Sequence, residues 1–276
     1  MEYVQLGPTS TRVPKIGFGT YLYQGGTGVL QRAHALGATL VDTAEAYGTE
    51  ARVASDLTGL RADFVVATKI SPENLRSADL LAHAAESLKR LSTEWIDLYQ
   101  IHAPNPDIPI VETMAAMREL VSDGRVRHVG VSNFSVPQMQ EAQDALGDIP
   151  LASNQVRYSL AVRTIEDDVL PYCQNNDITV IAYSPLARKG DFSASGLEDA
   201  RAIAGLEGSC DDLAQRLEKV AAEIGKTPAQ IMLNWVVSQP RVITIPKTDR
   251  VERVDEAVGA LGWTLNPAQR AALTDS

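Results

Sequence analysis

The sequence is poor in the residues that build disulfide frameworks and metal sites. It has two cysteines in 276 residues, Cys173 and Cys210, without CxxC spacing, which is typical of a protein from a reducing compartment. The HExxH spacing of zinc hydrolases is absent, and so is a Ser-His-Asp order with a nucleophile elbow. Metal-dependent and hydrolytic activities therefore have little support, no bound metal is expected, and both cysteines are predicted to be packing thiols.

Basic residues and long apolar runs are also scarce. Lys and Arg number 25 against 35 Asp and Glu, which gives a formal net charge of −10. Nucleic acids and anionic lipids are held by an excess of Lys and Arg, so no nucleic-acid or membrane partner is expected. There is no run of about 18 apolar residues, and no basic and then apolar leader at the start. We expect a soluble, cytoplasmic protein, monomeric or weakly homo-oligomeric, and the acidic balance is compatible with a salt-adapted host.

What the sequence does contain is an alternation of short apolar, β-branched runs with stretches whose apolar residues recur at helical spacing. Hydrophobic residues make up 45% of the chain, which is enough to form a sizeable core. The stretches between the runs predict helices, for example at residues 77–91 and 110–121. The runs themselves predict eight strands, at residues 15–20, 39–44, 64–70, 95–103, 126–133, 150–158, 179–186 and 242–248.

Eight strands alternating with helices are compatible with an open doubly wound sheet or a closed barrel, and the number eight favours the barrel. We therefore predict an α/β protein in which residues 1–276 form a single (β/α)8 TIM barrel domain. Residues 2–14 are predicted to form an N-terminal β-hairpin with Gly7-Pro8 at its turn, which would suit a plug across the barrel floor. The long interval between residues 186 and 242 is predicted to hold two or three helices, including 211–224 and 227–238, the latter with Thr227 as N-cap.

Polar residues gather where the predicted strands end. In barrels of this kind the functional residues lie at the carboxyl ends of the strands, on one face. The polar ends therefore predict a site at one mouth of the barrel. They are DTAEAYG (residues 42–48), Lys69, His102, GVSNF (130–134), Asn154-Gln155, YSPL (183–186) and IPKT (245–248).

Four of these residues predict proton-transfer chemistry. A lysine at the end of a buried strand is costly unless paired, and Asp42 on the neighbouring strand is the expected partner of Lys69. That ammonium would stabilise a nearby phenolate, so we expect the pKa of Tyr47 to fall below its usual value of about 10. His102, one strand further, could hold a carbonyl oxygen or relay a proton. The alternative for Lys69 and Asp42 is a structural buried ion pair, which the adjacent tyrosine and histidine disfavour.

With these residues in order, the sequence resembles the aldo-keto reductase family from Gly17 to about Val258. DTAEAYG is similar to the family's signature loop, and Lys69 and His102 stand where the family places the rest of its catalytic tetrad. GVSNF and IPKT are similar to two further family motifs. One such motif is weak by itself, whereas five ordered matches at family-like separations are specific. The resemblance implies an NADPH- or NADP-dependent oxidoreductase that reduces aldehydes or ketones to alcohols, or catalyses the reverse.

The resemblance also implies a role for each matched residue. Tyr47 would be the general acid, with its pKa lowered by Lys69, which Asp42 orients, while His102 would position the carbonyl oxygen. The nicotinamide carboxamide would be held by Ser132, Asn133 and Gln155, and Tyr183 would stack on the ring. Further implied cofactor contacts flank the nicotinamide and ribose or follow the diphosphate, and they are Gly19, Thr20, Tyr21, Asp42, Ser184, Pro185 and Leu186.

At the adenosine end, the resemblance implies a 2′-phosphate pocket formed by Lys247, Thr248 and Arg253, with Glu256 near the adenine. Two cations and a hydroxyl close to the start of a helix suit an anion, so NADPH is expected rather than NADH. Arg188 and Lys189 could also touch the phosphates, although a solvated loop is an equal alternative.

Departures from the family pattern bear on specificity. Ala257 stands where many members carry Asn, and Ala103 where Trp is common. The loop at residues 105–109 is short, and the chain ends at Ser276 without the long carboxyl-terminal loop of some members. We therefore expect a more open, less selective pocket for a small carbonyl or alcohol substrate. The alternative function is a regulatory barrel that binds NADPH and turns over substrate only incidentally.

Overall fold

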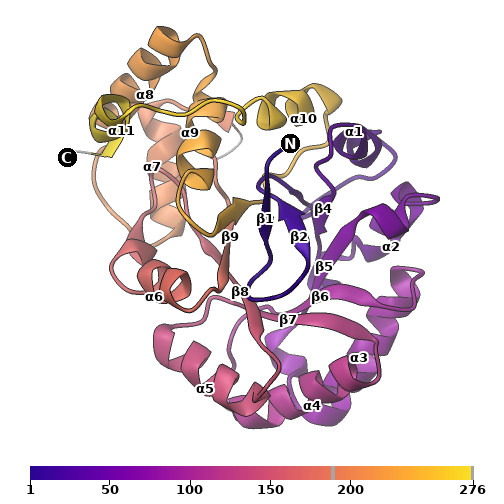
Figure 1. Cartoon of the computed structure of the whole chain (residues 1–276). Helices are drawn as coiled ribbons and strands as arrows, with labels where there is room; N and C mark the ends of the chain where they lie inside the picture. The colour runs from indigo at the N-terminus through magenta and orange to yellow at the C-terminus, as the bar shows by residue number, and fades with distance from the viewer. Residues whose placement is uncertain (188–189, 275–276) are drawn as a thin grey trace.

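The computed structural model describes residues 1–187 and 190–274, and its central feature is a parallel sheet closed into a barrel. Neighbours in sequence are neighbours in the sheet throughout (Figure 1). Bridges between Ile16 and Thr244 and between Gly19 and Lys247 join the first strand to the last. The predicted (β/α)8 barrel is confirmed, with each strand shorter than the apolar run that predicted it. The strands are β3 (Phe18–Gly19), β4 (Leu40–Asp42), β5 (Val65–Ile70), β6 (Ile96–Ile101), β7 (Val126–Ser132), β8 (Leu151–Arg157), β9 (Thr179–Tyr183) and β10 (Val242–Thr244).

Helices surround the strands (Figure 1). The interval between β9 and β10 holds α7, α8 and α9, as predicted, and Thr227 caps α9 in a reciprocal pair of hydrogen bonds with Gln230. None of the described helices is long and apolar enough to cross a membrane. The helices are α1 (Val29–Ala35), α2 (Glu50–Asp56), α3 (Ser77–Arg90), α4 (Ile110–Ser122), α5 (Val136–Leu146), α6 (Val169–Asn175), α7 (Ala194–Ile203), α8 (Asp211–Ile224), α9 (Pro228–Val237), α10 (Val251–Val258) and α11 (Pro267–Thr274); short 3₁₀ turns are η1 (Glu45–Tyr47), η2 (Arg61–Asp63), η3 (Pro72–Asn74) and η4 (Thr164–Glu166).

The N-terminal hairpin, β1 (Tyr3–Gln5) and β2 (Arg12–Pro14), closes one end of the barrel (Figure 1). Leu6 and Val13 of the hairpin join a buried apolar cluster with inward-facing residues of the barrel strands. The backbone N–H of Gly7 donates to Thr179 Oγ1 at 2.7 Å, at the first residue of β9. Gly7 has a φ of 57°, and a Cβ there would lie 2.5 Å from the carbonyl oxygen of Ala152, so the turn needs glycine. The predicted floor plug is confirmed.

Above this apolar layer the inward-facing side chains become polar. Leu40, Ala67 and Leu98 belong to the apolar cluster, and two residues further along the same strands come Asp42, Lys69 and Gln100, all buried. Successive side chains of a strand point to opposite faces, so residues two apart share the barrel interior. The strand alternation thus places a charged layer directly beneath the mouth opposite the plug.

Candidate active site

The structure brings the four predicted catalytic residues together. Asp42 ends β4, Lys69 lies on β5, His102 follows β6, and Tyr47 ends the 3₁₀ turn η1. Lys69 is fully buried, and its Nζ donates to Asp42 Oδ1 at 2.5 Å and to the carbonyl oxygen of Thr43 at 3.0 Å. Tyr47 Oη lies 3.4 Å from His102 Nε2. A buried ion pair therefore lies beneath a phenol and an imidazole that face each other.

Tyr47 is in a different electrostatic state from the one expected. Burial raises its pKa well above 10.0, and the negative charge of Asp42 raises it further. The Lys69 ammonium lies 5.1 Å from the centre of the Tyr47 ring, and Asp42 compensates its charge at much shorter range. The expectation that Lys69 lowers the pKa of Tyr47 is thus wrong for this structure. The phenol stays protonated at neutral pH, which is the form that a proton donor requires.

His102 is neutral at neutral pH. Burial lowers the pKa of its imidazole below 6.5, and the positive charge of Lys69 lowers it further. A neutral imidazole has one nitrogen that donates and one that accepts a hydrogen bond. Tyr47 and His102 can therefore both donate to an oxygen placed between them.

Asp42 has more partners than the sequence predicted. Its Oδ2 accepts a hydrogen bond from Gln100 Nε2 at 3.1 Å and from Gln155 Nε2 at 2.8 Å. Gln100 was not predicted, although its place two residues after Leu98 put it on the inner face. Gln155 was predicted to hold a carboxamide, and in this structure its amide nitrogen donates to Asp42. The buried carboxylate is thus compensated by one ammonium and two amides.

Three further predicted residues, Ser132, Asn133 and Tyr183, form a hydrogen-bonded group beside His102. Asn133 has a φ of 60°, a left-handed conformation that Asn tolerates better than most residues. Its Nδ2 donates to the His102 carbonyl oxygen at 3.1 Å and to Ser132 Oγ at 3.0 Å, while its Oδ1 accepts from Tyr183 Oη at 3.1 Å. The ends of β7 and β9 are therefore tied together next to the imidazole.

The predicted residues line one continuous cleft made of two cavities. An inner cavity of about 420 Å³ contains Tyr47 and His102, and an outer cavity of about 590 Å³ lies toward α10. Arg157, Ser184, Pro185 and Lys247 line both cavities. Lys69 lies beneath the cleft and, among the described residues predicted to be catalytic or to bind the cofactor, is the one that lines neither cavity. The other predicted inner residues are Gly19, Thr20, Tyr21, Asp42, Ser132, Asn133, Gln155 and Tyr183, and the other predicted outer ones are Leu186, Thr248, Arg253 and Glu256.

Several residues of the cleft were not predicted from the sequence. Arg157 lies two residues after Gln155 on β8, so strand alternation could have placed it at the mouth; its guanidinium lies 5.2 Å from the centre of the Tyr183 ring. Asp249 and Arg250 also line the outer cavity. Arg188 and Lys189, which were candidates for phosphate contacts, lie outside the described residues. Across residues 1–187 and 190–274 there is no group of three or more His, Cys, Asp and Glu side chains that could hold a metal ion.

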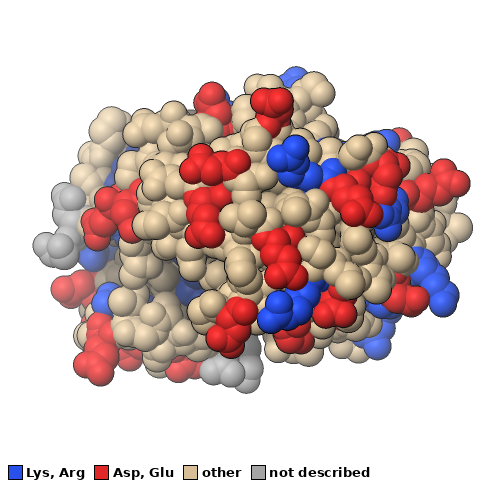
Figure 2. All heavy atoms as spheres, turned by 90° about the horizontal axis from the view of Figure 1, so that it is seen from below, with Lys and Arg blue, Asp and Glu red and all other residues tan. Residues whose placement is uncertain are grey.

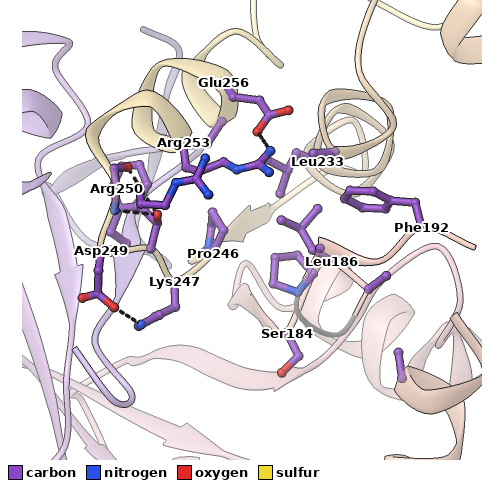
Figure 3. Close-up of a pocket in the computed structure, with 18 of the residues that line it drawn as sticks. Ser184, Leu186, Phe192, Leu233, Pro246, Lys247, Asp249, Arg250, Arg253 and Glu256 are labelled. Atoms are coloured by element: carbon purple, nitrogen blue, oxygen red, sulfur yellow. Dashed lines mark hydrogen bonds and ion pairs between the residues drawn. The ribbon is translucent and has the colours of Figure 1, made fainter. Parts of the chain in front are cut away.

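The outer cavity concentrates positive charge in an acidic chain. Figure 2 shows acidic side chains spread over the face on the side of α4 and α5, with basic ones between them, in keeping with the net charge of −10. The outer cavity, by contrast, is lined by Lys247, Arg250 and Arg253 (Figure 3). Three cations at one end of the cleft, and a phenol and imidazole at the other, fit a phosphorylated dinucleotide whose reactive ring lies beside Tyr47.

Comparisons with known proteins agree with this geometry. The Aldo/keto reductase family profile matches residues 15–276. An uncharacterised oxidoreductase of Mycobacterium tuberculosis is 37% identical over 90% of this chain and 80% of its own length, and methylglyoxal reductase YeaE of Escherichia coli is 36% identical over 86% and 79%. Among solved structures, the thermostable aldo-keto reductase Tm1743 with the inhibitor epalrestat is similar at a TM-score of 0.86, with 34% identity and 99% of each chain covered. An aldo/keto reductase from Klebsiella pneumoniae with NADP and acetate has a TM-score of 0.83 and 34% identity, over 98% of this chain and 94% of that one.

Proposed function

This chain belongs to the aldo/keto reductase family, and on that premise we propose that it is an NADPH-dependent reductase of small aldehydes and ketones that uses Tyr47 as the proton donor. The observation that carries the proposal is the contact between the Tyr47 hydroxyl and neutral His102, in a cleft directly above the Lys69–Asp42 pair. We also propose that residues 1–276 act as one domain, which is supported by the uninterrupted strand order from β3 to β10.

In this proposal the residues of the cleft have separate roles in cofactor binding, substrate positioning and proton donation. NADPH, when bound along the cleft, supplies the hydride that reaches the carbonyl carbon. Ser132 and Asn133 hold the carboxamide end of the cofactor, and Tyr183 provides an aromatic surface for its ring. His102 holds the carbonyl oxygen, and Tyr47 donates its proton to that oxygen as the carbon is reduced. Lys247, Thr248 and Arg253 bind the 2′-phosphate, and Gln155 fixes Asp42 beneath the site.

Two relatives support this assignment. The Klebsiella pneumoniae structure contains NADP, which supports the cofactor, and the Escherichia coli relative is named a methylglyoxal reductase, which supports small 2-oxoaldehydes among the substrates. The decisive experiment follows the loss of NADPH absorbance with a panel of small and bulky aldehydes. We expect turnover of several small aldehydes without strong preference for one shape. Tight NADPH binding without turnover of any of them would instead favour the regulatory barrel.

Arg253 is expected to contribute to the choice of cofactor. Replacing it with Gln removes a guanidinium from the outer cavity, so we expect NADPH affinity to fall about tenfold and NADH affinity to change less than about twofold, because only NADPH carries the 2′-phosphate. Fluorescence titration of both cofactors measures this. Arg32→Gln is the matched control, since Arg32 pairs with Asp255 and lines neither cavity. Equal losses for both cofactors would place the phosphate elsewhere.

The pH profile of reduction is expected to be flat between about pH 7 and 9.5. The pKa of Tyr47 is raised above 10.0, so the proton to be donated stays in place throughout this range, and the pKa of His102 is lowered below 6.5, so the imidazole stays neutral. Measuring kcat/KM against pH, with NADPH affinity followed in parallel, checks this. A fall in kcat/KM centred below pH 9, with unchanged NADPH affinity, would show that Lys69 does lower the pKa of Tyr47 in the working enzyme.

A further inference from the structure

The outer cavity contains a carboxylate where a phosphate site would be expected to have none. Asp249 lines this cavity together with Lys247 and Arg253. Lys247 Nζ donates to Asp249 Oδ2 (Figure 3), and the backbone N–H of Gln24 donates to Asp249 Oδ1 at 3.0 Å. Each carboxylate oxygen of Asp249 therefore accepts a hydrogen bond, and one of the two donors is Lys247, the cation that the family resemblance assigns to the 2′-phosphate.

Glu256 is a second carboxylate of the outer cavity, and it pairs with Arg253 as Asp249 pairs with Lys247. Arg253 forms an ion pair with Glu256, one turn along α10 (Figure 3). Arg250 lines the cavity and forms no ion pair with a described residue. With Arg157, which lines both cavities, the outer cavity has four cations and two carboxylates, a formal charge of +2 instead of the +4 that its basic residues alone would give.

This arrangement weakens the discrimination between the two nicotinamide cofactors. A 2′-phosphate near Lys247 must displace Asp249 and then remain close to its negative charge. An adenosine ribose without the phosphate meets no such repulsion, and a carboxylate is the group that dinucleotide sites use to accept a hydrogen bond from a free 2′-hydroxyl. Asp249 therefore disfavours NADPH and favours NADH.

We propose that Asp249 is a specificity-determining residue that makes this chain accept NADH alongside NADPH, by occupying Lys247 and by offering an acceptor to a free ribose hydroxyl. The proposal rests on the proposed function, because it concerns the adenosine end of the same cofactor site. It makes the role of Lys247 conditional on Asp249, whereas the family resemblance implies that this lysine binds the 2′-phosphate directly.

The test compares Asp249→Asn with Asp255→Asn. The Asn side chain keeps an oxygen that can accept from the Gln24 N–H but lacks the charge that holds Lys247. Asp255 lies on α10, pairs with Arg32 and lines neither cavity. Asp255→Asn therefore removes one negative charge near the outer cavity without changing the residues that line it. Affinities for NADPH, NADH and adenosine 2′-monophosphate are measured by titration, and melting temperatures show that each variant is folded. Asp249→Ser serves as a second charge-free variant.

We expect Asp249→Asn to bind NADPH and adenosine 2′-monophosphate about five- to tenfold more tightly than the wild type, with NADH binding unchanged or up to about threefold weaker. Asp255→Asn should stay within about twofold of the wild type for all three ligands. If both Asp249 variants bind NADPH no more tightly than Asp255→Asn while the wild type binds and oxidises NADPH, this inference is wrong and the proposed function stands. If the wild type binds neither cofactor, both fail.

Discussion

Tyr47→Phe is expected to lower kcat/KM for reduction of a small aldehyde about a thousandfold, with NADPH affinity changed less than about twofold. The substitution removes one hydroxyl from the inner cavity, the one that lies 3.4 Å from His102 Nε2. Without it the carbonyl oxygen loses its proton donor as charge develops on it, whereas the outer cavity is untouched. Stopped-flow or steady-state NADPH oxidation, together with a fluorescence titration of NADPH, measures both quantities.

Tyr21→Phe is the matched control for this experiment. Tyr21 lines the same cavity, and its ring packs edge-on against Tyr47 with 5.3 Å between ring centres, but the residue is 61% exposed. Loss of its hydroxyl should change kcat/KM less than about threefold, because water can replace it. A Tyr47→Phe variant that keeps more than a tenth of the wild-type kcat/KM, or a Tyr21→Phe variant as slow as Tyr47→Phe, would remove Tyr47 from the proposed role.

Much of this site could be predicted because it follows from the order of the chain. Parallel strands with helical crossovers bring all their carboxyl ends to one mouth, so Lys69, His102 and Asn133 had to lie near one another once the barrel was assumed. The hairpin plug followed from a turn signal at Gly7-Pro8 that precedes the first barrel strand. These predictions need only the direction of each strand, which the alternation of elements supplies.

The electrostatic state of the site could not be predicted in the same way. The pKa of Tyr47 depends on how deeply the ring is buried and on which charges remain uncompensated around it, and neither quantity can be derived from sequence spacing. The partner of Gln155 depends on a contact between β4 and β8, strands that are distant in the sheet. The pairing of Lys247 with Asp249 depends on a loop conformation. The proximity of the side chains in the site was thus predictable from the sequence, whereas the partners that compensate their charges were not.

Lys69→Met is expected to reduce both the stability and the activity of the chain. It would leave Asp42 as a buried carboxylate with two amide donors but no cation, so the free energy of unfolding should fall by about 3–5 kcal/mol. The uncompensated charge would also raise the pKa of Tyr47 further and make it a poorer proton donor, so kcat/KM should fall at least about a hundredfold. Denaturant unfolding and NADPH oxidation measure the two effects.

The double variant Asp42→Asn, Lys69→Met separates structural from catalytic roles. Because it removes both buried charges and keeps similar side-chain volumes, its free energy of unfolding should return to within about 2 kcal/mol of the wild type. Its kcat/KM should remain at least about tenfold below the wild type, because the hydrogen bonds that Lys69 donates to Asp42 and to the Thr43 carbonyl oxygen, just before the turn that carries Tyr47, would be lost. Recovery of activity together with stability would mean that Lys69 and Asp42 are only a structural ion pair. Recovery of stability alone is the result expected if the pair supports proton donation by Tyr47.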